Sequence, residues 1–182
     1  MANPTVLLET TSGEWVLRPA MAQAAAWHRA GLLMTVSVNV SANHLLQPGF
    51  FAHLQATLAR DPEVKPEHFE LEVLESAAIA DIEQAIGILL DCRQLGIHFA
   101  LDDFGTGYSS LTYLRKLPID TLKIDQSFVA MIGVDALSRH ILDSIIELSG
   151  KLDLGIVAEG VETIEQCEYL AAQGVDFLQG YL

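Results

Sequence analysis

The sequence predicts a parallel α/β fold, either a (β/α) barrel or an open doubly wound sheet. Short apolar runs of strand length alternate with helix-like segments from Gly13 to the end of the chain. The predicted strands are too apolar for one face to lie in water, which favours parallel strands covered by helices. Polar residues interrupt these strands near their carboxyl ends, where both folds carry their active sites. Their spread over six strands favours the barrel, because widely spaced strands bring residues together only when the sheet closes.

The predicted elements follow from periodicity and from turn residues. Residues 13–30 form the first helix, since Trp15, Ala20, Ala24 and Trp27 fall on overlapping i, i+4 rows and Gly31 supplies a stop. Residues 34–40 alternate apolar and polar side chains, as a strand does. Further helices are predicted at 45–60, 81–95, 111–117, 135–148 and 163–173. Further strands are predicted at 69–75, 97–103, 121–125 and 154–159, with a last one from 175 onward.

Composition limits the classes of protein that fit. No break in composition divides the 182 residues, so we expect one domain over residues 1–182. A net charge of −14 excludes nucleic-acid polymers and anionic membranes as partners, because both would be repelled. No apolar run approaches the ~20 residues of a membrane span, and no signal peptide is visible. Cys92 and Cys167 lack the spacing of a metal or redox motif, which fits free thiols in the cytoplasm.

Asp102 and Asp103 end the apolar strand that begins near His98. Two carboxylates at ~4 Å repel by roughly 4 kcal/mol at an effective dielectric constant near 20. A divalent cation is the usual means of offsetting such repulsion. The pair therefore predicts a metal site at the carboxyl end of a parallel strand.

Other polar residues at the strand ends extend this site. They offer carboxylate and amide oxygens, which suit Mg²⁺ or Mn²⁺ rather than zinc. With Asp102 as a bridge, the set could hold two ions that clamp a phosphoryl displacement, and Lys123 could orient or deprotonate a water or neutralise charge. The full set is Asn39, Glu72, Asp102, Asp103, Lys123, Asp125, Glu159, Glu162 and Gln179.

Structural explanations compete for several of these residues. Lys123 and Asp125 share a strand face and could form a simple ion pair. Glu70 and Glu75 alone would be ordinary strand-edge charges. We expect His98 to be a hydrogen-bonded core histidine rather than a ligand, because it lies deeper than Asp102.

At this point the motifs resemble those of the EAL domain family of bacterial cyclic di-GMP phosphodiesterases. Six segments match in the family's order between about Gly13 and the end of the chain. They are Val36–Ser41 (VSVNVS), Glu70–Ser76 (ELEVLES), Leu101–Ser110 (LDDFGTGYSS), Leu122–Asp125 (LKID), Ala158–Thr163 (AEGVET) and Leu178–Tyr181 (LQGY).

The resemblance implies a TIM-like barrel that hydrolyses one phosphodiester of cyclic di-GMP to linear pGpG with Mg²⁺ or Mn²⁺. It implies that Asn39, Glu72 and Asp102 hold one ion, and that Asp102, Asp103 and Glu159 surround the second. It further implies catalytic roles for Lys123 and Glu162, with Gln179 and Asp125 at the substrate. Glu75 would anchor the loop 104–110, which links the metal site to a homodimer interface in the family. Sensory or diguanylate-cyclase domains are expected in the parent protein.

The chain departs from the family at its front, where no Glu-Ala-Leu tripeptide occurs. The family also has two strands before its first helix and a final helix after the last strand, so we expect a domain truncated at both ends. Losing one carboxylate ligand weakens a metal site, and we therefore expect impaired catalysis. The alternative is a non-catalytic cyclic di-GMP receptor or a protein-interaction module.

Overall fold

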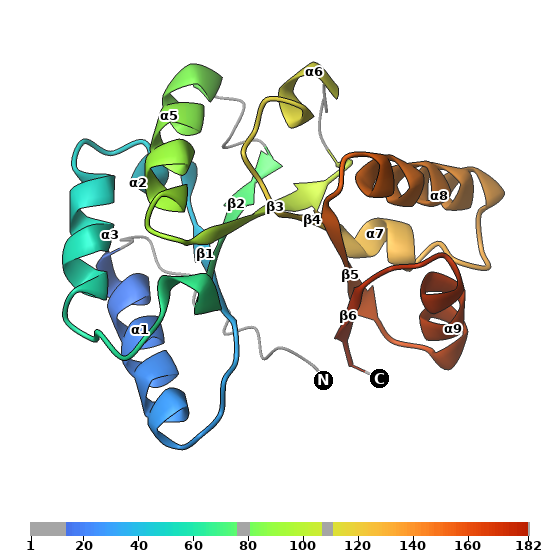
Figure 1. The fold of residues 1–182 in the computed structure, drawn as a ribbon. Helices are drawn as coiled ribbons and strands as arrows, with labels where there is room; N and C mark the ends of the chain where they lie inside the picture. Colours follow the sequence, from blue (N-terminus) through green and yellow to red (C-terminus); the bar gives the residue numbers. More distant parts are fainter. Residues whose placement is uncertain (1–13, 76–80, 107–110, 182) are drawn as a thin grey trace.

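The computed structural model describes residues 14–75, 81–106 and 111–181. Within them, six strands form one parallel sheet in the order β1-β2-β3-β4-β5-β6. The sheet is curled into a half-barrel with the helices on its outer side (Figure 1). The strands are β1 (Val36–Val40), β2 (Phe69–Leu74), β3 (His98–Phe104), β4 (Thr121–Ile124), β5 (Gly155–Val161) and β6 (Phe177–Gly180).

The helices connect successive strands, as the alternating pattern predicts. Side chains at the amino ends fix several of them; Thr163 and Gln166, for example, form a capping box. The longer helices are α1 (Glu14–Arg29), α3 (Phe50–Leu58), α5 (Ile82–Arg93), α8 (Ala136–Lys151) and α9 (Ile164–Ala172). The short ones are α2 (Ala42–Leu45), η1 (Pro66–His68), α6 (Leu111–Leu114) and α7 (Gln126–Val129).

Several helical segments differ from the prediction. The helix expected at 45–60 is shorter, because α3 covers only Phe50–Leu58; the separate short helix α2 ends at Leu45, and Pro48 and Gly49 lie between the two. The residue before a proline avoids the helical region, and Gly49 has a left-handed backbone with φ of 92°. The helix α7 was not predicted, because four residues are too few for a periodic pattern. Its start is capped by Asp125, whose side chain accepts a hydrogen bond from the backbone N–H of Ser127 at 3.0 Å.

The two faces of the sheet have opposite character. Alternate strand residues such as Val38, Leu71, Phe99, Leu122 and Ile156 are buried between the sheet and the helices. The residues between them face the inside of the half-barrel and are mostly polar. That inner face borders a space of about 590 Å³, lined among others by Ser37, Glu70, Glu72, His98, Thr121, Lys123, Val157 and Gln179. The hydrophobic layer of this fold therefore lies outside the sheet, and the concave face is left for polar chemistry.

Close packing of α7 on β5 depends on Gly160. Its φ is 69°, and a Cβ there would lie 2.5 Å from the Cβ of Gln126. A side chain is excluded at this position, because real Cβ atoms do not approach so closely. This contact fixes the chain directly after Glu159. None of the helices described here is long and apolar enough to cross a membrane.

Candidate functional site

Two β-bulges bring three carboxylates together at the carboxyl ends of β3 and β5. Between Leu101 and Phe104, β3 has one residue more than β4 opposite, and β5 has one more than β6 between Ala158 and Val161. The second residue of each bulge is left-handed, with φ of 55° at Asp103 and 69° at Gly160. Strict alternation would send Asp102 and Asp103 to opposite faces. The bulge instead lets both precede Phe104, which returns to the buried layer.

Asp102, Asp103 and Glu159 each offer a carboxylate oxygen within 4.8 Å of the others. The sequence prediction of an acidic cluster here is confirmed to this extent. Asp103 also donates its backbone N–H to the Asp102 Oδ1 atom at 3.1 Å. Carboxylate oxygens are the ligands that hard divalent cations prefer, so the donor set fits such an ion.

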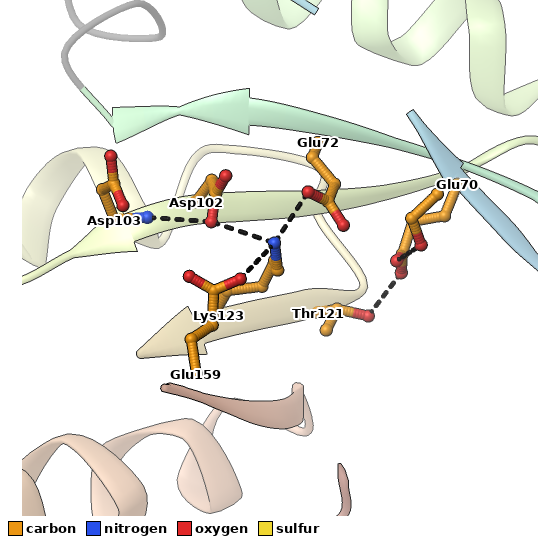
Figure 2. A network of polar contacts seen from close by, with 8 residues as sticks. Glu70, Glu72, Asp102, Asp103, Thr121, Lys123 and Glu159 are labelled. Atoms are coloured by element: carbon orange, nitrogen blue, oxygen red, sulfur yellow. Dashed lines mark hydrogen bonds and ion pairs between the residues drawn. The ribbon is translucent and has the colours of Figure 1, made fainter. Parts of the chain in front are cut away.

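Lys123 on β4 is surrounded by carboxylates from three other strands (Figure 2). Its Nζ atom lies 2.7 Å from Glu72 Oε2, 3.1 Å from Asp102 Oδ1 and 2.7 Å from Glu159 Oε1. The Lys123 side chain is only 3% exposed. This ammonium group is the internal counter-charge of the acidic cluster.

Burial and crowding of like charges perturb the acids of the site. Burial raises the pKa of Glu72 from 4.5 to about 7, although Lys123 opposes the shift. Burial also raises the pKa of Asp103, with further contributions from Asp102 and Asp125. The pKa of Glu159 is raised by burial in the same way. The surrounding carboxylates raise the pKa of Lys123 above its usual range, against the effect of burial. The site therefore favours a cation and resists full ionisation of its acids.

The other predicted site residues are not among the carboxylates that surround Lys123. Asn39 on β1 is in register with Glu72, and Gln179 on β6 lines the inner space. Asp125 caps α7. Glu162 is exposed, and its backbone N–H donates to Gln166 Oε1 at 2.8 Å.

Three of the structural explanations are wrong. Lys123 binds Glu72, Asp102 and Glu159, and no ion pair with Asp125 occurs among the described residues. The His98 side chain is 48% exposed rather than a core group, and its Nδ1 lies 3.6 Å from Asp120 Oδ2. It is exposed because it is the first residue of β3, at the amino end of the strand, where it lines the inner space.

The third concerns Glu70 and Glu75, which are not ordinary strand-edge charges. Glu75 is 6% exposed, and its Oε2 accepts a hydrogen bond from the Gly105 N–H at 3.3 Å. Residues 107–110 of the predicted loop lie outside the described part of the chain. Glu70 accepts hydrogen bonds from the hydroxyls of Ser37 and Thr121, each at 2.8 Å. The sequence offered one signal for Glu70, since it shares a strand face with Glu72.

Comparison with known proteins places the chain among bacterial signalling domains. Residues 3–182 match the family model described as the EAL domain. A cyclic di-GMP phosphodiesterase of Pseudomonas aeruginosa is 38% identical over 182 residues, which are 100% of this chain and 31% of that protein. The chain thus spans between a quarter and a third of the length of such curated relatives.

Solved structures agree with the family match. The PaMucR phosphodiesterase, in complex with c-di-GMP, superposes with a TM-score of 0.88 at 40% identity, covering 92% of this chain and 68% of that one. BlrP1 of Klebsiella pneumoniae, in a manganese and cyclic di-GMP complex, has a TM-score of 0.80 at 28% identity, covering 91% of this chain and 42% of that one.

Proposed function

The chain belongs to the EAL domain family, and from this premise we propose that it hydrolyses one phosphodiester of cyclic di-GMP to linear pGpG with the help of Mg²⁺ or Mn²⁺. The observation that carries the proposal is the group of carboxylates around Lys123 at the carboxyl ends of the strands. Relatives named as cyclic di-GMP phosphodiesterases and a neighbour bound to c-di-GMP support the substrate.

We propose that two divalent ions bind here. Asn39, Glu72 and Asp102 would hold the first, and Asp102, Asp103 and Glu159 the second. Bound ions would supply Lewis-acid stabilisation of the charge that develops on the phosphoryl oxygens. The oxygen-rich donor set and the manganese in a neighbouring structure support this assignment.

Lys123 acts in the proposal through its hydrogen bonds. Because its pKa is raised, the ammonium keeps its proton near neutral pH and orients a water rather than removing a proton from it. All three N–H donors of the Nζ atom face carboxylates in this structure, so the donor for the water would be one that a carboxylate releases when it binds an ion. Glu162, which is exposed and lies three residues after Glu159, is the candidate to accept a proton from that water.

The remaining assignments concern substrate and partners. Gln179 and Asp125 would contact the dinucleotide, and Glu75 would anchor the loop 104–110 through Gly105. We propose one catalytic domain over residues 1–182 that works as a homodimer in the cytoplasm. Since relatives are about three times as long, we also propose that it operates beside sensory or diguanylate-cyclase domains.

Incubation of the chain with cyclic di-GMP and Mn²⁺, followed by chromatography, tests the proposal. The expected product is pGpG, and Asp103→Asn should abolish its formation. Asp153→Asn is the matched control, because Asp153 is also a left-handed aspartate (φ 58°) but is exposed and lies after α8. Dinucleotide that binds without divalent ions and stays intact would instead establish the receptor alternative.

A further inference from the structure

A second polar layer lies on the same inner face, nearer the amino ends of the strands than the carboxylate cluster. None of the roles above uses it. Its centre is Glu70 on β2, two residues before Glu72 on the same strand face. One Glu70 oxygen accepts from the hydroxyl of Ser37 on β1, and the other accepts from the hydroxyl of Thr121 on β4, both at 2.8 Å. Ser37 is 7% exposed. The bond to Thr121 is visible to the right of the Lys123 group in Figure 2.

The bond from Glu70 to Thr121 passes over an intervening strand. β3 lies between β2 and β4, so the two residues come from strands about 10 Å apart along the sheet. The same crossing is made one layer higher, where Glu72 reaches Lys123 at 2.7 Å. Both bridges thus join β2 to β4, and Thr121 and Lys123 are two residues apart on β4.

Ala100 leaves the space for both bridges. It is the inner-face residue of β3 between His98 and Asp102, it is fully buried, and it is in register with Glu72 on one side and Thr121 on the other. A side chain larger than this methyl group would extend into the space between the two bridges. The small residue on the middle strand is therefore part of the arrangement.

We propose that Glu70 is a positioning residue for the cation centre, acting through Thr121 and Ser37 and across the gap at Ala100. By holding β4 against β2 one layer below, the Glu70–Thr121 bond sets where Lys123 meets Glu72. Lys123 in turn fixes the carboxylates of Asp102 and Glu159. Loss of the lower bridge then changes the geometry of the site without removing any group from it.

The inference rests on the proposed cation centre, and Mn²⁺ binding to the folded chain tests it separately from turnover. Thr121→Val removes the hydroxyl and keeps the shape. Groups that hydrogen-bond a metal ligand directly are worth about 10- to 100-fold in metal affinity, and Thr121 acts one bond further away, through Glu70. We therefore expect the dissociation constant for Mn²⁺, from titration calorimetry of the 182-residue chain, to rise by about tenfold, the lower end of that range. Thr121→Ser restores the hydroxyl and should restore the affinity. Ala100→Val, which fills the gap, should weaken binding as Thr121→Val does.

Thr57→Val is the matched control. Thr57 is 4% exposed, and its hydroxyl donates to the His53 carbonyl at 2.8 Å within α3, outside the site. It should lower thermal stability by an amount comparable to Thr121→Val and leave Mn²⁺ affinity unchanged. If Thr121→Val does not fold, Ser37→Ala tests the other hydrogen bond of Glu70: it removes the hydroxyl that orients Glu70 toward Thr121, and it should also weaken Mn²⁺ binding.

Two results would overturn the inference. One is an Mn²⁺ affinity in Thr121→Val equal to that of the unaltered chain, or a loss matched by Thr57→Val. The other is a lack of Mn²⁺ binding by the unaltered chain. Mn²⁺ binding without pGpG formation would refute only the proposed function, and the affinities of the variants would still decide the role of Glu70.

Discussion

Replacing Lys123 with methionine should make the stability of this chain depend on pH and on divalent cations. The substitution removes the charge but keeps most of the apolar stem. It leaves Glu72, Asp102 and Glu159 without the ammonium that lies within 3.1 Å of each of them. Removing one partner of a buried ion pair costs about 3–5 kcal/mol, because the remaining charge is uncompensated.

The pH dependence arises because the variant can remove the uncompensated charge by protonating one more carboxyl, at a free-energy cost that depends on pH. For Glu159, whose ordinary pKa is 4.5, holding a proton at pH 7 costs about 3.4 kcal/mol, since each pH unit is worth about 1.36 kcal/mol. At pH 5 the same proton costs only about 0.7 kcal/mol. We therefore expect Lys123→Met to lose about 3 kcal/mol of unfolding free energy at pH 7 and less than about 1 kcal/mol at pH 5.

Urea unfolding at both pH values, with and without Mn²⁺, measures these differences. Mn²⁺ at a hundred times its dissociation constant adds about 2.7 kcal/mol and should restore most of the loss at pH 7. Lys151→Met is the control, because Lys151 pairs with Glu147 on the surface of α8, where both side chains are about 70% exposed. Such an exposed pair contributes little to stability, because water screens the two charges. An equal loss at pH 5 and pH 7 in Lys123→Met would refute the reasoning.

Three further predictions concern the unaltered site and its neighbours. Because the folded chain holds a proton on Glu72 between pH 4.5 and about 7 and the unfolded chain does not, the metal-free protein should lose about 3 kcal/mol of unfolding free energy as pH rises across that interval; a flat urea profile there would contradict this. Asp103→Asn should stabilise the metal-free protein by roughly 1 kcal/mol in the same assay at pH 7, since asparagine tolerates a left-handed backbone and carries no charge, while calorimetry should show weaker Mn²⁺ binding. Gly160→Ala should lower the unfolding free energy by roughly 2–4 kcal/mol, because its Cβ would meet the Cβ of Gln126 at 2.5 Å in a left-handed backbone; unchanged thermal unfolding would show that α7 can move away.

The sequence was sufficient for features that depend on local pattern. The succession of strand and helix patterns, the apolar character of the strands and the glycine or proline residues between segments predicted the parallel strands with their helices. The adjacent acids at 102 and 103 predicted a cation site. Two neighbouring carboxylates must lie close enough to repel each other, and a cation offsets that repulsion. These inferences needed only neighbours in sequence.

The remaining features depend on pairing between strands, which no local pattern reveals. A bulge is a mismatch in residue count between two strands, so the one at Asp103 became visible only with the β3–β4 register. The reach of Glu70 to Thr121 depends likewise on the register that places Ala100 between them. His98 was expected in the core because it lies deeper along its strand than Asp102, whereas its place as the first residue of β3 exposes it.

The two faces of the sheet have separate roles, and this separation affects how the sequence can vary during evolution. Folding depends on the outer residues, such as Val38 and Leu71, which contact helices. Recognition and reaction depend on the alternate residues, which contact whatever enters the half-barrel. Since the strands carry both sets alternately outside the two bulges, point mutations of concave residues that lie away from the buried Lys123 group can be sampled with little penalty to folding. A library that varies only Thr35, Val157 and Gln179 is thus a direct route to new specificity on an unchanged scaffold.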